Sequence, residues 1–213
     1  MEQAVSSLGA FGAVAGGKSR YDTGSHVDMS SISLITGVST GWDMSSGNLT
    51  LGVFFEYGNG SYDTYNSFSN AASVDGDGDV YHLGGGILSR MNLTGSEAGH
   101  FYIEGSGRAG KVYNDYNSAD LRDAAGHATQ YDSSSTYYGL HLGIGYVWNM
   151  FEAASLDFYS KYFWTRQEGD AVRLSSGDSV DFEAVDSHRL RLGSRFVYAL
   201  NEYISPYAGA AFE

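Results

Sequence analysis

Residues 136–148 alternate between two kinds of side chain over more positions than strands of soluble sandwiches usually sustain. One set of alternate positions is apolar with aromatic ends: Tyr138, Leu140, Leu142, Ile144, Tyr146 and Trp148. The other set is mostly small or polar. Successive side chains of a strand point to opposite faces. A strand that crosses a bilayer needs about 9–11 residues, apolar outward and polar inward, with aromatic girdles at both interfaces. The segment therefore predicts a membrane-spanning β-strand.

The composition agrees with a chain of such strands. It combines 29 Gly and 17 Tyr with one Pro and no Cys, which excludes disulfide-stapled modules and cysteine-based metal or redox sites. The net charge of −13 argues against a nucleic-acid surface. No apolar run reaches about 18 residues, so no transmembrane helix is expected. A mean hydropathy of −0.25 suits a barrel, whose lipid-facing residues occupy every second position. Because Met1-Glu2-Gln3 lacks the basic and apolar regions of a signal peptide, we expect the front end of an exported protein to have been removed.

The pattern recurs in nine segments, separated by connections that are alternately short and long. The segments are 8–20, 29–42, 48–61, 79–93, 100–114, 134–148, 154–167, 181–199 and 202–213. The short connections are 43–47, 94–99, 149–153 and 200–201. The long ones, rich in Asp, Ser, Asn and Gly, are 21–28, 62–78, 115–133 and 168–180. Outer-membrane barrels have short periplasmic turns and long extracellular loops, so the N-terminus is predicted to be periplasmic.

These connections predict one all-β domain over residues 1–213, an antiparallel up-and-down transmembrane β-barrel with no helix longer than a turn or two. The alternation also assigns faces. Five residues are predicted to face lipid: Leu142, Ile144, Phe158, Tyr162 and Leu192. The polar side chains predicted to line the lumen are Glu56, Glu104, Arg108, His141, Asp157, Lys161, Arg189, Arg191 and Arg195. Glycines within these strands, such as Gly84, Gly85 and Gly86, are expected to allow bending and to let aromatic rings lie over the backbone.

Motifs along nearly the whole chain, from about Ser7 onward, resemble those of the β-domain of classical autotransporters, the translocator of type V secretion. They are 99–105 with Arg108 and Gly110, 116–123, 138–146, 156–163, 174–178 with Phe182, 187–195, and 205–213. The resemblance implies a twelve-stranded barrel with a helix from the passenger linker in its pore. This chain has about nine strands and lacks the closing strands, so we expect an incomplete barrel, either an open curled sheet or a strained closure between residues 8–20 and 202–213. Three further strands would complete it.

The resemblance also implies a function and a location. The domain would anchor in the outer membrane of a Gram-negative bacterium and export a covalently linked N-terminal passenger to the cell surface. The implied partners are outer-membrane lipid, the passenger with its linker helix, the barrel-assembly machinery and periplasmic chaperones. We expect no nucleic-acid partner, no cofactor, no metal and no enzymatic activity.

Three other functions remain open on the residues alone. A porin or channel without a passenger would share the polar lumen. A barrel enzyme could use His141 near Glu104 as part of a Ser-His-acid site, but no Gly-x-Ser-x-Gly elbow accompanies them, and a lumen charge network explains the same residues. Weak calcium binding at Asp75–Asp79 is disfavoured, because the sixth and twelfth positions of an EF-hand loop hold Val80 and Gly86 here.

Overall fold

Eleven β-strands make up most of the computed structural model, which describes residues 7–122, 125–175, 177–201 and 204–213. Their bounds are β1 Ser7–Asp22, β2 His26–Met44, β3 Gly47–Asn66, β4 Val74–Leu93, β5 Gly99–Arg122, β6 Ala128–Phe151, β7 Ala154–Gln167, β8 Asp170–Arg173, β9 Ser179–Phe182, β10 Val185–Tyr198 and β11 Tyr207–Phe212. The described residues contain no helix. Accordingly, no helix in this part of the chain is long and apolar enough to cross a membrane.

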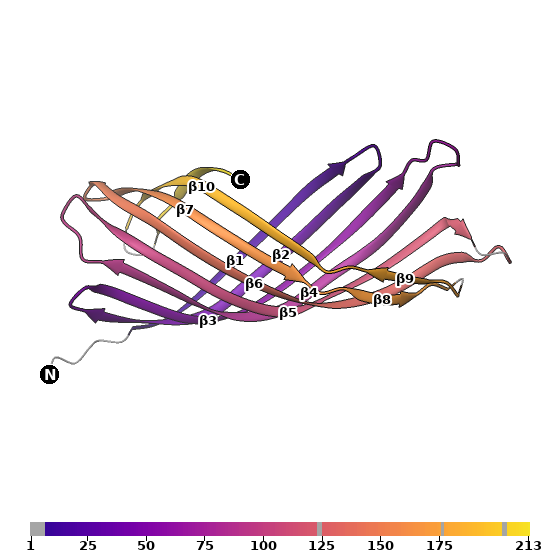
Figure 1. The fold of residues 1–213 in the computed structure, drawn as a ribbon. Coiled ribbons are helices and arrows are strands. Elements are labelled where there is room, and N and C mark those ends of the chain that lie inside the picture. Colours follow the sequence, from indigo (N-terminus) through magenta and orange to yellow (C-terminus); the bar gives the residue numbers. More distant parts are fainter. Residues whose placement is uncertain (1–6, 123–124, 176, 202–203) are drawn as a thin grey trace.

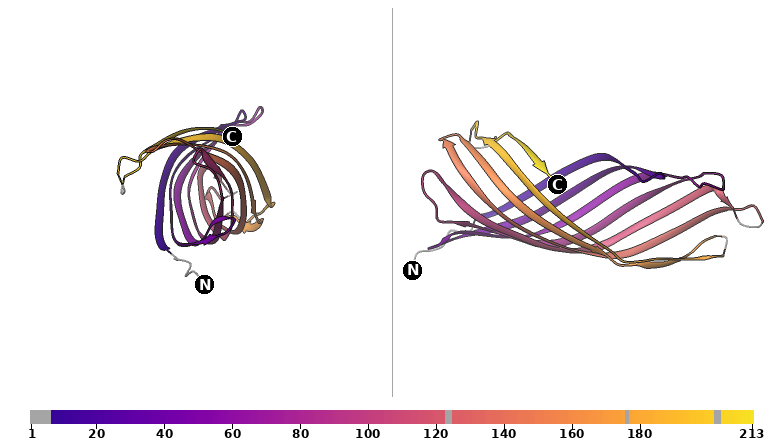
Figure 2. Two further views of the ribbon diagram at one scale, coloured as in Figure 1. Left: turned by 90° about the vertical axis from the view of Figure 1, so that its left-hand side faces the viewer. Right: turned by 45° about the horizontal axis from the view of Figure 1, so that its top comes forward.

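Nine of the strands form one sheet in the order β1-β2-β3-β4-β5-β6-β7-β10-β11, with every neighbouring pair antiparallel. The sheet is a meander that curls around a long axis into a half-barrel (Figures 1 and 2). The predicted fold class is confirmed: an antiparallel up-and-down sheet of the barrel type.

The strands are longer than predicted on the side of the long connections. For example, β5 ends at Arg122 rather than near residue 114, and β6 begins at Ala128 rather than near residue 134. The ladder continues there through pairs such as Asn114↔Ser133 and Asn117↔Gln130. The loops predicted at 62–78 and 115–133 are therefore shorter in the structure than predicted, because strands extend into both ranges. Apolar alternation stops at the edge of the apolar band, whereas backbone hydrogen bonding needs no apolar side chain.

The predicted loop at 168–180 and the predicted strand at 181–199 both need correction. Strands β8 and β9 form a separate two-stranded hairpin, and β10 begins only at Val185. The hairpin continues the line of β7 and β10 after a break (Figure 1). It is tied to β6 where the Ser134 backbone N–H donates to Asp170 Oδ2 over 2.8 Å. In the last predicted segment, only Tyr207–Phe212 is a strand, and residues 202–203 lie outside the described part.

The turn between β1 and β2 is tight. The β1–β2 turn needs only residues 23–25, where Gly24 has a φ of +93° that favours glycine. The Gly24 N–H donates to Asp22 Oδ1 over 3.0 Å, which fixes the turn by a side chain two residues back. The hairpin register is therefore set locally, as an antiparallel meander requires.

The best-buried side chains lie on the face opposite the exposed apolar residues. In β3, Glu56 is 2% exposed between Phe55 at 47% and Tyr57 at 40%. Glycines on the buried face make room for rings: a Cβ at Gly86 would stand 2.6 Å from the Phe54 ring. The expectation that these glycines let aromatic rings lie over the backbone is confirmed at Gly86.

The sheet has two free edges. Within the described residues, β1 pairs only with β2, and β11 pairs only with β10. Because β11 has 6 residues against 14 in β10, the stretch of β10 from Val185 to Arg191 also lacks a partner on its outer side. The geometry is that of a trough rather than a closed tube (Figure 2).

Candidate functional site: the polar face of the half-barrel

The largest polar cluster centres on Glu104 of β5. Lys161 Nζ of β7 lies 2.5 Å from Glu104 Oε1, Arg90 Nη1 of β4 lies 3.4 Å from Oε2, and His141 Nε2 of β6 lies 3.4 Å from Oε1. One carboxylate thus joins four adjacent strands. Because the Glu104 side chain is only 12% exposed, its charge depends on Lys161 and Arg90.

A second cluster centres on Glu56 of β3. Tyr137 Oη of β6 donates to Glu56 Oε1 over 2.5 Å, and Arg108 Nη1 of β5 donates to Oε2 over 3.1 Å. Arg108 also donates to Thr165 Oγ1 of β7 over 3.4 Å. The Glu56 side chain is 3% exposed, so both of its oxygens are satisfied by side chains from strands β5 and β6, across β4.

A third group lies nearer the short turns. Tyr102 Oη donates to Asp157 Oδ1 and Arg195 Nη2 donates to Asp157 Oδ2, both over 2.9 Å.

A fourth group lies on β10, where Arg189 Nη1 and Arg191 Nε donate to the two oxygens of Glu213, over 3.1 and 2.6 Å. These two arginines also lie over the Phe163 ring, with guanidinium carbons 5.7 and 5.3 Å from its centroid.

The nine residues singled out from the sequence thus fall into separate groups. Glu104, His141 and Lys161 meet; Glu56 meets Arg108; Asp157 meets Arg195; and Arg189 and Arg191 meet only through Glu213. The predicted site residues do not include Arg90, Tyr102, Tyr137 or Glu213. Tyr102 and Tyr137 lie at inward positions of the predicted alternation, and extending that alternation along β4 would have included Arg90, whereas Glu213 follows the last strand.

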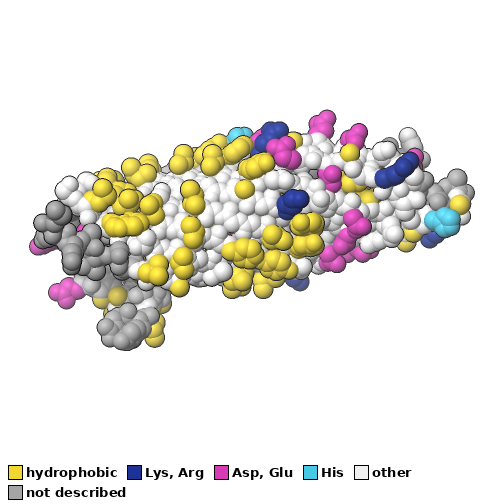
Figure 3. Space-filling view, turned by 90° about the horizontal axis from the view of Figure 1, so that it is seen from below, with side chains coloured by type: hydrophobic (Ala, Val, Ile, Leu, Met, Phe, Trp, Pro, Cys, Tyr) yellow, Lys and Arg dark blue, Asp and Glu magenta, His cyan; other side chains and the backbone are white. Residues whose placement is uncertain are grey.

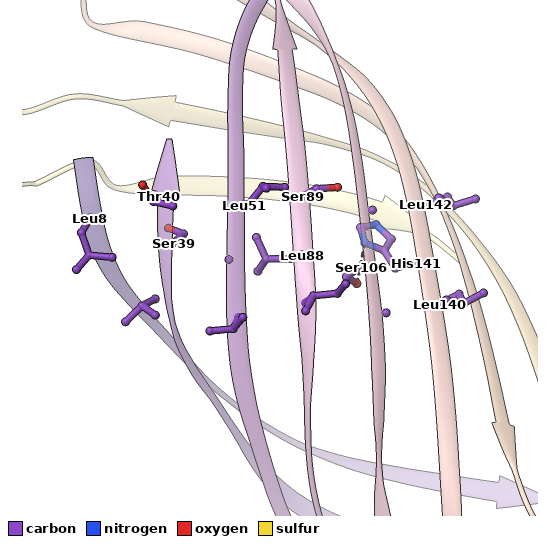
Figure 4. A pocket seen from close by; sticks show the side chains of 16 residues that line it. Leu8, Ser39, Thr40, Leu51, Leu88, Ser89, Ser106, Leu140, His141 and Leu142 are labelled. Atoms are coloured by element: carbon purple, nitrogen blue, oxygen red, sulfur yellow. Dashed lines mark hydrogen bonds between the residues drawn. The ribbon is translucent and has the colours of Figure 1, made fainter. Parts of the chain in front are cut away.

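Ser106, His141 and Glu104 come together in an order that resembles a hydrolytic triad. Ser106 Oγ lies 3.5 Å from His141 Nδ1, and His141 Nε2 lies 3.4 Å from Glu104 Oε1. Figure 4 shows His141 leaning toward Ser106 while Leu140 and Leu142 point away. Ser106 sits inside a regular ladder between β4 and β6, so the backbone offers no preorganised pair of N–H groups for an oxyanion. The arrangement fits a charge network better than a catalytic site.

The opposite face carries the apolar side chains. The five predicted lipid-facing residues are all exposed: Leu142 64%, Ile144 61%, Leu192 50%, Phe158 47% and Tyr162 41%. Hydrophobic side chains form a broad band over this face, and charged ones gather beyond it toward the long-connection end (Figure 3). A shallow groove of about 830 Å³ crosses the strands between two rows of this band, with Leu51, Ile87 and Leu140 among its walls (Figure 4).

The acidic run Asp75–Asp79 is part of β4, and its backbone is hydrogen-bonded to side chains of β5. The backbone N–H of Asp75 donates to Asp120 Oδ2 and that of Asp79 to Asp115 Oδ1, each over 2.9 Å. Among the described residues, no group of three or more His, Cys, Asp or Glu side chains is placed to hold a metal ion.

Comparison with known proteins identifies the family. The family model described as "Autotransporter beta-domain" matches residues 10–213. No curated protein matches the chain. The match covers nearly the whole sequence, so the chain belongs to the autotransporter β-domain family, whose barrels are outer-membrane translocators of Gram-negative bacteria rather than enzymes.

Proposed function

We propose that this autotransporter β-domain anchors in the outer membrane and lets a covalently linked N-terminal passenger reach the cell surface. The observation that carries the proposal is the family match over residues 10–213. The two faces of the sheet support it. The exposed face is apolar where lipid would lie, and the opposite face carries ion pairs that a hydrated polypeptide path needs.

The mechanism is physical. Side chains such as Trp148 and Tyr138, 44% exposed at the two ends of one strand's apolar row, would hold the barrel at the membrane interfaces. The lumen face, with Glu56, Glu104, Arg108, His141, Asp157, Lys161 and the arginines of β10, would first accept an extended passenger segment and then a linker helix. Delivery to the membrane would use periplasmic chaperones and the barrel-assembly machinery.

A display experiment tests the proposal. A signal sequence, a protease-sensitive reporter and the linker helix of a complete family member are fused before Ser7, and the fusion is expressed in a Gram-negative host. One version carries residues 7–213; another adds three closing strands from a complete family member. We expect external protease to cleave the reporter on intact cells for the closed version. A closed, membrane-inserted barrel that leaves the reporter inside would contradict the proposal.

A channel without a passenger is the second candidate, because the same ion-pair network would line a water-filled pore. The two functions differ in what occupies the closed barrel. A translocator whose lumen holds a linker conducts poorly until the linker is removed by proteolysis, whereas a channel conducts at once. Planar-bilayer recordings of the closed version, with and without the linker, separate them.

A further inference from the structure

The lumen face carries more basic than acidic side chains, although the chain as a whole has a net charge of −13. Its described basic residues along the membrane-spanning part of the strands are Arg90, Arg108, Lys161, Arg189, Arg191 and Arg195. The acidic ones there are Glu56, Glu104 and Asp157, joined by Glu213 just after β11. Acidic residues are thus concentrated elsewhere, and this face has a surplus of positive charge.

Arg90 and Lys161 share Glu104, and Arg189 and Arg191 share Glu213, so the more exposed part of the surplus lies on β10. Glu56, Glu104 and Asp157 each have at least one cationic partner, and their side chains are 3, 12 and 4% exposed. In contrast, Arg189 and Arg191 share the single carboxylate of Glu213, and their side chains remain 47 and 41% exposed. Two guanidiniums with one anionic partner leave donors available to another acceptor, since each guanidinium carries five N–H groups.

A recess beside Arg189 is the place where such an acceptor would fit. It measures about 230 Å³, and the residues that line it include Phe54, Phe163, Arg108 and Arg189. Arg108 enters it from β5 and Arg189 from β10, and the two rings supply apolar walls. Of the acidic residues, only Glu56 lines the recess, and both of its oxygens are already bonded to Arg108 and Tyr137.

We propose that Arg108 and Arg189 form a binding site for a carboxylate side chain of the polypeptide segment that occupies the lumen; this rests on the proposed translocator function. The guanidinium fork matches a carboxylate in geometry and charge, and the apolar walls strengthen the interaction by excluding water. Arg191, two residues along β10, extends the site for a neighbouring acidic residue. The partner is therefore an acidic peptide, and a basic or neutral one is disfavoured.

The first test measures peptide binding. The full chain is refolded in detergent micelles, and its β content is checked by circular dichroism. Two fluorescent peptides of alanine and serine differ only in having glutamate or glutamine at the same positions. We expect the glutamate peptide to bind about tenfold more tightly by fluorescence anisotropy. Equal binding of the two peptides by a folded chain would overturn the site.

Variants locate the site. Arg189→Gln is expected to remove most of the preference for the glutamate peptide, whereas Arg189→Lys keeps part of it. Arg108 is left intact, because its loss would strand the buried Glu56. Arg173→Gln is the matched control, since Arg173 lies on the β8–β9 hairpin away from the recess. A loss in Arg173→Gln equal to that in Arg189→Gln would contradict the proposed site.

A second arm separates this site from the translocator function and does not need the refolded chain. In the closed display fusion, the glutamates of the linker are changed to glutamine. Slower or reduced surface exposure of the reporter, rescued by restoring glutamate, supports the site. Unchanged exposure refutes the site and leaves translocation standing. Peptide binding without any export refutes translocation and leaves the site standing.

Discussion

At the scale of single residues, buried charges on the lumen face depend on their partners. Glu56 is 2% exposed, and among the described residues Arg108 is the cation that pairs with it. We expect Arg108→Ala to destabilise the folded sheet by about 3–5 kcal/mol, because an uncompensated carboxylate remains buried. Lys111→Ala, on the same strand but facing outward, should change stability by less than about 0.5 kcal/mol. Urea titrations of the refolded chain followed by tryptophan fluorescence measure both. Similar midpoints would refute this account of Glu56.

Glycine positions offer a second comparison at this scale. A Cβ on Gly145 would lie within 2.6 Å of the Tyr102 ring, whereas the nearest atom to a Cβ on Gly107 is Leu140 Cδ2 at 3.6 Å. Gly145→Ala should therefore cost about 1–3 kcal/mol by displacing Tyr102 from Asp157, and Gly107→Ala should be tolerated. The same urea titration measures the stability of both variants. A large loss of stability in Gly107→Ala together with none in Gly145→Ala would contradict this account of the Tyr102 contact.

At the scale of the element, the face that each strand turns to lipid is an all-or-none property of its register. Leu142 and Ser134 lie on the same face of β6, the first within the apolar band and the second beyond it. Leu142→Arg is expected to cost about 2–4 kcal/mol in a bilayer and Ser134→Arg about 0–1 kcal/mol. Folding titrations into lipid vesicles, on the protein extended by three closing strands, measure the difference. Equal losses of folding free energy in the two variants would contradict the assignment of Leu142 to the lipid-facing side of β6.

The same element shows how far sequence reasoning reaches. Within the apolar band, alternation located β6 and its lipid-facing residues, because lipid and lumen impose opposite demands on successive positions. Beyond the band, lipid no longer requires apolar side chains at alternate positions, and Ser133, Ser134 and Ser135 carry no alternation although the ladder continues. The hairpin β8–β9 was not predicted either, because it also lies beyond the apolar band, where side chains do not alternate. The ion pairs of Glu104 were also hidden, since they depend on the register of four strands that single-strand patterns do not contain.

At the scale of the whole molecule, the decisive feature is the pair of unpaired edges. The outer edge of β1 exposes backbone N–H and C=O groups over up to 16 residues, and β10 and β11 form a second free edge. Each unsatisfied backbone group in hydrocarbon costs several kcal/mol, so an open sheet is not tolerated in lipid. Bacterial single-chain barrels also use even strand numbers, which nine strands in the main sheet do not satisfy.

We therefore expect residues 7–213 alone not to form a stable membrane pore, and three added closing strands to produce one. Twelve strands would pair β1 with the last strand, returning both ends to the side of the short turns. The measurement compares the two proteins after refolding in detergent, by heat-modifiable mobility on gels and by conductance in planar bilayers. The extended protein should migrate as a compact monomer when unheated and should conduct once any linker is removed. If residues 7–213 do so unaided, β1 and β11 must find each other in the membrane, and the free edges seen here would not persist there.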